Sequence, residues 1–375
     1  MTFMTGGRKT FLIVAVLLAA VLVGLIFIAA RDWRTLTQYG EILPGSEKPT
    51  RHDKEPGEQF NPASLTWESA TSSAEWQTRD SAASFVFSGK MWTMGGLDGN
   101  RYFEGGGRVR YWEAPHFNDI WSSEDGTVWK LEKEHAEWPL RRSMTVVEFR
   151  GKLLMFGGWS KITGYDTRDV WQSEDGITWN NVASSTPWSA REGHTAEVFG
   201  GRIWIFGGVN YDERKTKNDV WYSEDGINWH EATTTIPWST RWDHATAVFK
   251  GKIFLTGGMD LKGGAFNDEW VSSDGLNWEL VATSSPWASR QGHSMVVLKD
   301  RLWIVGRLND DSAKGGPNDV WYSEDGVNWQ KTDTDPPWLG REDESILVYK
   351  DKIWVFGGMG SDWKWHNDVW YSKFP

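Results

Sequence analysis

The sequence contains no cysteine among its 375 residues. Disulfide bonds, zinc–thiolate sites and cysteine nucleophiles are therefore excluded. The sequence also lacks an excess of basic residues, because 40 Lys and Arg stand against 51 Asp and Glu and give a formal net charge of −11. Nucleic acids bind to basic surfaces, so we expect no nucleic acid partner.

Tryptophan, in contrast, is abundant, with 28 residues, and an internal repeat accounts for most of them. The stretch NDVWYSEDGINW at 218–229 returns as NDVWYSEDGVNW at 318–329, and the chain ends on a partial copy, NDVWYSKFP. An arginine opens each of six copies, at intervals of roughly 50 residues, and a repeat of this length indicates a solenoid or a propeller. The six arginines are Arg79, Arg141, Arg191, Arg241, Arg290 and Arg341.

Each repeat contains four short runs rich in Val, Ile, Phe and Trp, separated by Gly-Lys or a similar turn, by Gly-Gly with a loop, and by Asp-Gly. Such turns predict four antiparallel strands, which we call a to d. In five repeats a tryptophan of strand d stands at a fixed distance before the next arginine, as Trp229 does before Arg241, whereas the sixth repeat lacks it. Trp67 stands at the same distance before Arg79. We therefore predict that an N-terminal strand completes the last blade and closes the ring, which removes the open sheet edge.

The pattern R-x-G-H, GG, NDVW and W recurs from Trp67 to Pro375 and resembles the kelch repeat. The resemblance implies an all-β fold, a six-bladed β-propeller of four-stranded antiparallel blades with strand a innermost. The SEDG turns between strands c and d also resemble the Asp-box of sialidases, but there the glycine comes one residue later. We interpret these turns as structural. We expect a monomer.

The stretch Phe11–Ala30 is apolar throughout, without a single polar side chain, and it is long enough for a helix to cross about 30 Å of hydrocarbon. We predict a short cytoplasmic N-terminus over residues 1–10, a transmembrane signal-anchor helix over residues 11–30, a flexible tether over residues 31–61 and the propeller over residues 62–375. The expected localisation is that of a single-pass membrane protein with its propeller on the extracytoplasmic side. Cleavage after Ala30 is the alternative.

The six repeated arginines are expected at the mouth of the central channel, where like charges repel one another. Aspartates recur with the same period at the start of strand c and could neutralise the ring through charge-assisted hydrogen bonds. The alternative is an anion-binding mouth, which resembles how some kelch domains hold acidic ligands. The repeated aspartates are Asp119, Asp169, Asp219, Asp268, Asp319 and Asp368.

The loop between strands b and c is about twice as long in the first repeat, where it covers Leu97–Phe117, as in the other five repeats. Long insertions on one face of a repeat array mark its binding side. Aromatic and arginine side chains on this and nearby loops predict a stacking surface, because binding hot spots favour both types. The alternative is that the tryptophans fold over and plug the channel. The candidate residues are Trp112, Trp159, Trp242, Trp363, Trp365, Arg108, Arg110 and Arg142.

The sixth repeat reads REDE where other repeats read REGH or RWDH. Close carboxylates raise one another's pKa and can act as acid and base. Glu342, Glu344 and Asp80 are therefore candidate catalytic residues, with a role as counter-ions of the arginines as the alternative. His194, His244 and His293 share one repeat position on three blades, a position where kelch repeats commonly carry histidine. We expect no metal ion and no cofactor.

The favoured function is a membrane-tethered binding module whose partner is an anionic glycan or an acidic protein segment. Tryptophans would stack on sugar rings and arginines would hold carboxylates. A second hypothesis is a cofactor-independent enzyme, because kelch propellers include a sialic-acid mutarotase, and Glu342 or Glu344 with Arg341 or Arg79 could serve as its site. A third is a protein-interaction scaffold in the cell envelope. Nothing in the sequence demands catalysis, and the fold alone does not decide.

Overall fold

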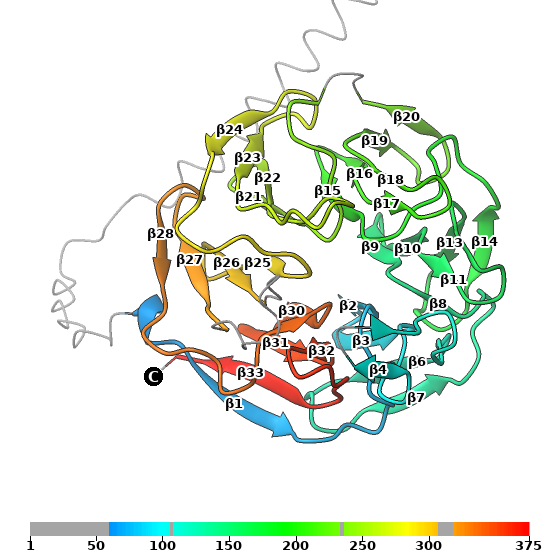
Figure 1. Ribbon diagram of the computed structural model, residues 1–375, viewed down its shortest axis with the longest axis horizontal. Helices are drawn as coiled ribbons and strands as arrows, with labels where there is room; N and C mark the ends of the chain where they lie inside the picture. Colours follow the sequence, from blue (N-terminus) through cyan, green and yellow to red (C-terminus); the bar gives the residue numbers. More distant parts are fainter. Residues whose placement is uncertain (1–59, 106–107, 233–235, 307–317, 375) are drawn as a thin grey trace, which may run out of the picture. The chain divides into compact units, whose positions relative to one another are not determined.

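The computed structural model describes residues 60–105, 108–232, 236–306 and 318–374. Residues Phe60–Pro375 form one compact unit, built of six four-stranded antiparallel sheets, or blades, arranged around a central axis (Figure 1). The innermost strands of neighbouring blades contact one another in a closed order, β2, β9, β15, β21, β25, β30 and again β2. This is the architecture of a six-bladed propeller.

Each blade runs from strand a at the axis to strand d at the rim. Blade 1 contains β2 (Ala83–Phe87), β3 (Lys90–Met94), β6 (Ile120–Ser123) and β7 (Lys130–Lys133). Blade 2 contains β9 (Thr145–Phe149), β10 (Lys152–Phe156), β13 (Val170–Ser173) and β14 (Asn180–Ala183). Blade 3 contains β15 (Thr195–Phe199), β16 (Arg202–Phe206), β19 (Val220–Ser223) and β20 (Trp229–Glu231).

Blades 4 to 6 repeat the order. Blade 4 contains β21 (Ala245–Phe249), β22 (Lys252–Thr256), β23 (Glu269–Ser272) and β24 (Glu279–Ala282). Blade 5 contains β25 (Ser294–Leu298), β26 (Arg301–Val305), β27 (Trp321–Ser323) and β28 (Trp329–Lys331). Blade 6 contains β30 (Ser345–Tyr349), β31 (Lys352–Phe356), β33 (Val369–Lys373) and, as its outer strand, β1 (Thr66–Thr71).

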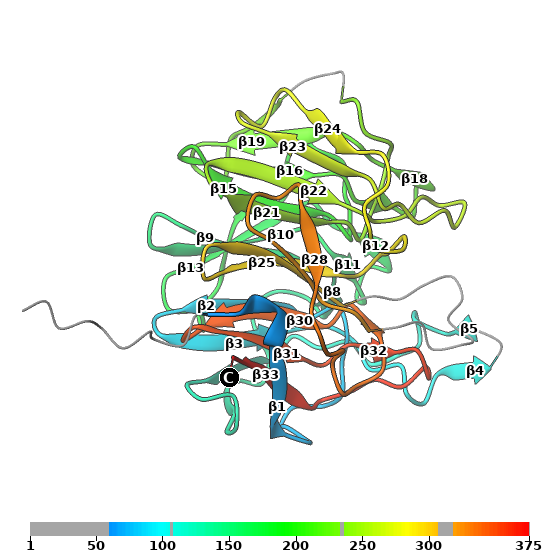
Figure 2. The same cartoon turned by 90° about the vertical axis from the view of Figure 1, so that its left-hand side faces the viewer.

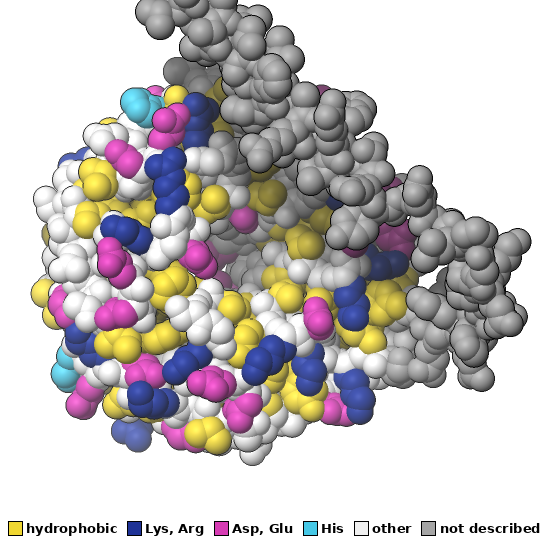
Figure 3. Space-filling model, turned by 180° about the vertical axis from the view of Figure 1, so that it is seen from behind, with side chains coloured by type: hydrophobic (Ala, Val, Ile, Leu, Met, Phe, Trp, Pro, Cys, Tyr) yellow, Lys and Arg dark blue, Asp and Glu magenta, His cyan; other side chains and the backbone are white. Residues whose placement is uncertain are grey.

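Short strands lie outside the blades, mostly in the b–c loops and beside the repeated arginines. They project on one side of the disc in Figure 2. They are β4 (Phe103–Gly105), β5 (Arg108–Val109), β8 (Arg141–Arg142), β11 (Trp159–Ser160), β12 (Tyr165–Asp166), β17 (Val209–Asn210), β18 (Lys215–Thr216), β29 (Arg341–Glu342) and β32 (Met359–Gly360). The opposite face carries the a–b and c–d turns, and there basic and acidic side chains alternate over the described surface (Figure 3).

The predicted closure of the ring by an N-terminal strand is confirmed. Strand β1 pairs antiparallel with β33, with Trp67 opposite Ser372. The indole of Trp67 packs edge-on against Trp338 of blade 5, with ring centroids 5.0 Å apart. The first and last strands of the propeller therefore share one blade, and the ring has no free edge between its ends.

The predicted transmembrane helix and single-pass membrane localisation are corrected. In the part of the chain that the structure describes, no helix is long and apolar enough to cross a membrane, and the helical element there is the three-residue 3-10 turn η1 (Pro62–Ser64). The predicted span Phe11–Ala30, like the expected cytoplasmic segment and most of the tether, lies outside the described residues. What the structure supports is an all-β fold.

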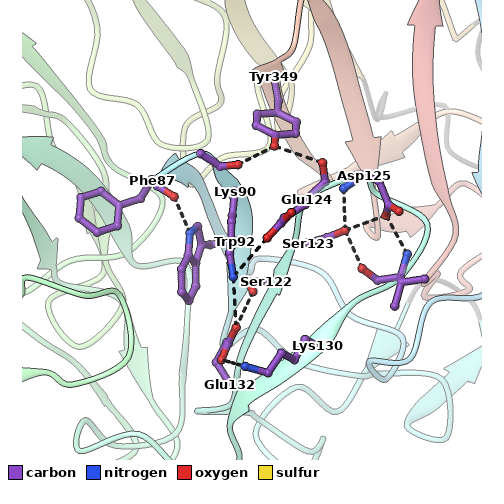
Figure 4. A network of polar contacts seen from close by, with 12 residues as sticks. Phe87, Lys90, Trp92, Ser122, Ser123, Glu124, Asp125, Lys130, Glu132 and Tyr349 are labelled. Atoms are coloured by element: carbon purple, nitrogen blue, oxygen red, sulfur yellow. Dashed lines mark hydrogen bonds and ion pairs between the residues drawn. The ribbon is translucent and has the colours of Figure 1, made fainter.

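The c–d turns are held by their own Ser and Asp side chains. In blade 3, Asp225 Oδ1 accepts hydrogen bonds from the backbone N–H groups of Ile227 and Asn228, at 2.8 and 2.7 Å, and Ser223 Oγ accepts one from Gly226 at 2.8 Å. The same contacts recur in blade 1, between Ser123, Asp125 and the backbone of the turn (Figure 4). The hydroxyl group of Tyr349 in blade 6 also donates to the carbonyl oxygen of Glu124 in this turn, at 3.1 Å. Because the Asp and Ser atoms are used internally, these turns are structural.

Candidate functional site

The six repeated arginines are fully buried, at 0–2% exposure, and each forms an ion pair with the repeated aspartate of its own blade. In blade 4, Arg241 Nη1 and Nη2 donate to the two oxygens of Asp268 at 2.7 and 2.8 Å, and Nη1 also donates to Gly257 O. The indole of Trp270 donates to Asp268 as well, at 2.8 Å. The donor groups of the arginines are therefore already used within their own blades. Binding of a ligand by these arginines stays a prediction.

A ring of backbone groups lies two residues after each arginine, and we call it the backbone ring. All six residues have positive φ, between 49° and 62°, a region that favours Gly and admits Asp and Ser only at a cost. This conformation lets blades join through main-chain hydrogen bonds, such as Ser143 N to Ser81 O at 2.8 Å and Asp243 N to Gly193 O at 2.9 Å. The backbone ring consists of Ser81, Ser143, Gly193, Asp243, Gly292 and Asp343.

A cavity of about 490 Å³ opens beside the backbone ring on the b–c loop side, and we call it the mouth cavity. Each blade contributes the residue that directly follows its repeated arginine. Those residues are Asp80, Arg142, Glu192, Trp242, Gln291 and Glu342. The b–c loops add aromatic walls from Tyr111, Trp112, Trp159 and Tyr211. Asp243 and Asp343 of the backbone ring also line it.

The charge of this lining is unbalanced. Five carboxyl groups and one arginine are among the described residues that line the mouth cavity. Arg142 Nη2 donates to Glu192 Oε1 at 3.0 Å, and its guanidinium lies over the rings of Tyr111 and Trp159, at 5.1 and 5.6 Å from their centroids. One arginine cannot neutralise five carboxylates, so the cavity favours positive charge.

Two buried carboxyl oxygens among the described residues of the mouth cavity lack hydrogen-bond partners of normal geometry. Glu342 Oε2 accepts a hydrogen bond from Gln291 at 3.1 Å, and Asp343 Oδ2 accepts one from Ser81 at 2.9 Å. Asp80 and Glu192 are only 3% and 1% exposed, yet Asp80 Oδ1 and Glu192 Oε2 make no hydrogen bond of normal geometry. Buried acceptors without donors are costly.

Burial raises the pKa values of all five carboxyl groups, and repulsion among them adds to the shift of most. Burial is the larger cause for Glu342, followed by the charges of Asp343 and Asp80. Burial and then Asp343 likewise hold the pKa of Asp80 well above its usual range. The positive charge of Arg142 lowers the pKa values of Asp80 and Asp343 and so opposes part of this rise. The carboxyl groups of the cavity therefore titrate as a coupled set, with pKa values above their usual range.

The predicted catalytic residues fall in two places. Asp80 and Glu342 line the mouth cavity, but Glu344 does not. Its carboxyl group turns between blades 5 and 6, where it lies against the α-carbon of Gly306. His194, His244 and His293 occupy the same position in blades 3 to 5, and burial holds their pKa values low. Among the described residues, no group of acidic or histidine side chains is placed to hold a metal ion.

The predicted stacking surface is divided by the fold. Trp365 is 2% exposed and belongs to a small core under the long loop, and Trp363 stacks on Phe103 with ring centroids 5.3 Å apart. Trp112 remains exposed at 63% and lines the mouth cavity with Trp159 and Trp242. The long loop thus packs on blade 6 and supplies one wall of the cavity, rather than plugging the channel.

The remaining predicted arginines lie elsewhere on the long loop. Arg110 pairs with Glu113 of the same loop and lies near Tyr102, at 5.8 Å from its ring centroid. The side chain of Arg108 lies outside the described part of the structure. Among the arginines predicted to bind a ligand, Arg142 is the one that lines the mouth cavity.

Comparison with known proteins identifies the repeat. A family model described as the KLHDC2/KLHL20/DRC7 Kelch-repeats domain matches residues 105–306. The chain belongs to the kelch-repeat family. Its fold is similar to a solved structure titled "Structure of YjhT", with a TM-score of 0.63 and 15% sequence identity, over 80% of this chain and 96% of that one. A comparison with curated proteins gave no match.

The kelch repeat also explains which site residues the sequence analysis missed. In every blade the arginine is constant, and the position after it varies among Asp, Arg, Glu, Trp and Gln. The constant residue builds the blade, whereas the variable one faces the mouth cavity. Glu192 and Gln291 could have been found by this contrast within the repeat, whereas Asp243 stands one position later. Tyr111 and Tyr211 carry no such signal, because b–c loops differ in length and sequence.

Proposed function

We propose that this kelch propeller is a binding module that receives a positively charged group in the mouth cavity. The observation that carries the proposal is the lining itself, five carboxyl groups and a single arginine within aromatic walls. A cation gains both from carboxylates in a partly dry site and from the faces of aromatic rings. The earlier prediction of an anionic glycan or acidic segment has less support, since such a ligand would meet mostly like charge.

The guanidinium of Arg142 illustrates how the mouth cavity holds a cation. It is bonded to Glu192 and lies over Tyr111 and Trp159. Blade 4 offers a similar environment without a cation of its own, with Trp242 next to Asp243 in the lining. An incoming ammonium or guanidinium group would find there the same two kinds of contact.

Calorimetric titration of the full chain tests the proposal with three matched probes, N-acetyl-arginine amide, N-acetyl-norleucine amide and N-acetyl-glutamate. Only the cation is expected to bind. Arg142→Gln should strengthen its binding by about tenfold, because a repelling charge a few ångströms away is removed, and Glu342→Gln should weaken it. An anionic ligand would respond in the opposite direction to both changes.

Arg202→Gln and Glu224→Gln are matched controls. They remove an arginine and a glutamate that pair with each other at the surface, outside the mouth cavity, and should leave binding unchanged. Binding of the glutamate probe, lost in Arg142→Gln, would refute a cation site and restore the anionic ligand. Failure of all three probes would also count against the proposal.

A second candidate function is acid–base catalysis on a sugar. It is favoured by one observation, the raised pKa values of Asp80 and Glu342 within a single cavity, because carboxyl groups of raised pKa can act as acid and base. Proton exchange spectroscopy of neutral and acidic sugars would detect faster interconversion of anomers. Loss of that exchange in both Asp80→Asn and Glu342→Gln would assign the chemistry to this cavity.

A further inference from the structure

The carboxyl groups of the mouth cavity come from two pairs of neighbouring blades. Blade 1 supplies Asp80 and blade 6 supplies Glu342 and Asp343, and we call these three the first acidic group. Blade 3 supplies Glu192 and blade 4 supplies Asp243, the second acidic group. In a closed ring of six blades, blade 1 faces blade 4 and blade 3 faces blade 6.

The two acidic groups are separated by blades that carry no acid in the lining. Blade 2 contributes Arg142 and blade 5 contributes Gln291. Arg142 is hydrogen-bonded to the second group through Glu192, and Gln291 to the first group through Glu342. Neither contact neutralises a whole group, so negative charge remains on both sides of the channel.

Each acidic group also contains one deeply buried oxygen without a donor. In the first group it is Asp80 Oδ1 and in the second it is Glu192 Oε2. Both side chains are more than nine-tenths buried and both line the mouth cavity. Carboxyl groups that line the cavity from two pairs of blades are matched by a ligand with two separate donors, not by one with a single charged end.

The aromatic wall of the mouth cavity suits an aliphatic chain. Trp242 and Tyr211 pack edge-on at 5.7 Å between centroids, and Trp112 and Trp159 face the cavity from the loops of blades 1 and 2. Aromatic faces bury methylene groups favourably. They also attract the ammonium groups that end such a chain.

We propose that the ligand of the mouth cavity is an aliphatic diamine or longer polyamine, with one ammonium group at each acidic group and its methylene chain along the aromatic wall. This rests on the proposed function, because it names the class of cation. The cavity volume of about 490 Å³ leaves room for a chain of several carbons between the two ends.

Calorimetry on the full chain tests the inference with 1,4-diaminobutane, spermidine and n-butylamine. The diamine should bind at least about tenfold more tightly than the monoamine of equal length, because its second ammonium reaches the opposite acidic group. A series of diamines of increasing length, measured on the unaltered protein, should show one optimum length. This series needs no variant and does not depend on any variant folding.

Variants then assign the two ends. Asp243→Asn and Glu342→Gln each remove one carboxylate from one group, and each should lower diamine affinity towards that of n-butylamine. The exposed pair Arg202 and Glu224 again supplies controls, since neither change should affect binding. Circular dichroism and thermal unfolding of each variant confirm that it remains folded.

The outcomes separate the two proposals. If n-butylamine and N-acetyl-arginine amide bind as tightly as the diamines, the polyamine inference is overturned and the cation site stands. If diamine affinity does not vary with length, bridging between the acidic groups is wrong. If no cation binds at all, both the inference and the proposed function fail.

Discussion

Glu344 is a buried carboxyl group at a position where three other blades carry histidine, and its replacement by glutamine should change how stability depends on pH. The side chain is 6% exposed, and neither of its oxygens has a hydrogen-bond partner. A Cβ on Gly306 would lie 2.2 Å from Glu344 Oε1, so the carboxyl group fills the space that this glycine leaves. Burial raises its pKa to about 8, although Arg341 acts against the shift.

The direction in which stability changes with pH follows from the pKa values of Glu344 in the folded and unfolded chains. Because the folded pKa lies above the unfolded one, the contribution of Glu344 to stability is fully present below about pH 4.5 and is lost as the pH rises through about 8. One pKa unit corresponds to about 1.4 kcal/mol. Between about pH 4.5 and pH 7 the loss is therefore about 3 kcal/mol. Glutamine cannot ionise, so the Glu344→Gln variant should not show this loss of stability.

Thermal unfolding of the full chain, followed across this pH range, measures the effect. For a domain of about 300 residues, about 3 kcal/mol corresponds to roughly 5 °C in Tm. Glu344→Gln should match the unaltered protein near about pH 4.5 and exceed it by a few degrees at about pH 7 to 8. Glu231→Gln, at an exposed position of β20, is the matched control and should shift neither curve. Parallel pH profiles for Glu344→Gln and the unaltered protein would refute the assignment of a raised pKa to this group.

Three further predictions follow from the repeat and the mouth cavity. Arg241→Met should destabilise the propeller by about 3–5 kcal/mol in chemical unfolding, because it leaves Asp268 buried without its partner; adding Asp268→Asn should recover part of the loss, and an equal loss in the double variant would contradict this. Asp225→Ala should cost about 1–3 kcal/mol, since two backbone donors of the c–d turn lose their acceptor, and Asp225→Asn should cost less. Amine binding at the mouth cavity should strengthen as the pH rises above the ordinary range of carboxyl groups, because a bound cation expels protons from carboxyl groups of raised pKa. The carboxyl groups that release protons are Asp80, Glu192, Asp243, Glu342 and Asp343, and the charge of Arg142 opposes the rise of most of their pKa values. Calorimetry in buffers of different ionisation enthalpy would detect the released protons.

Much of the fold could be predicted from the repeat, because the residues that define it act within one blade. The repeated arginine, aspartate and tryptophan contact one another in each blade, as Arg241, Asp268 and Trp270 do. A periodic pattern therefore contains the whole local structure. The closure through Trp67 could be predicted for the same reason, since a missing strand in one repeat and a surplus strand elsewhere are both visible in the sequence.

The transmembrane prediction rested on a different kind of signal. The stretch Phe11–Ala30 was assigned by its length and apolar composition alone, with no second element to constrain it. No membrane-spanning helix occurs in the described part of the chain, and an all-β unit is what the structure supports. The apolar composition of one segment is weaker evidence for a structural element than a sequence pattern that occurs in six repeats.

The candidate site was predicted less well, because it depends on what lies across the channel rather than along the chain. Glu192 and Asp343 belong to blades 3 and 6 and are far apart in sequence, yet the charge of Asp343 contributes to the raised pKa of Glu192. Trp365 was expected on the surface, but Phe103 and Tyr111 of the long loop pack around it and its neighbour Trp363. Loop folding of this kind leaves no periodic signal in the sequence.

The contrast between constant and variable positions suggests how a kelch propeller can change its ligand without losing its fold. The repeated arginine and the residue two positions later build the blade and the backbone ring, whereas the residue between them faces the mouth cavity. A substitution at Asp80, Arg142 or Glu342 therefore alters the charge of the cavity while the ion pairs that hold each blade stay in place. We expect the charge at these six intervening positions, together with Asp243 and Asp343 of the backbone ring, to decide whether the cavity accepts a cation or an anion. The repeated arginine ring is not expected to decide it.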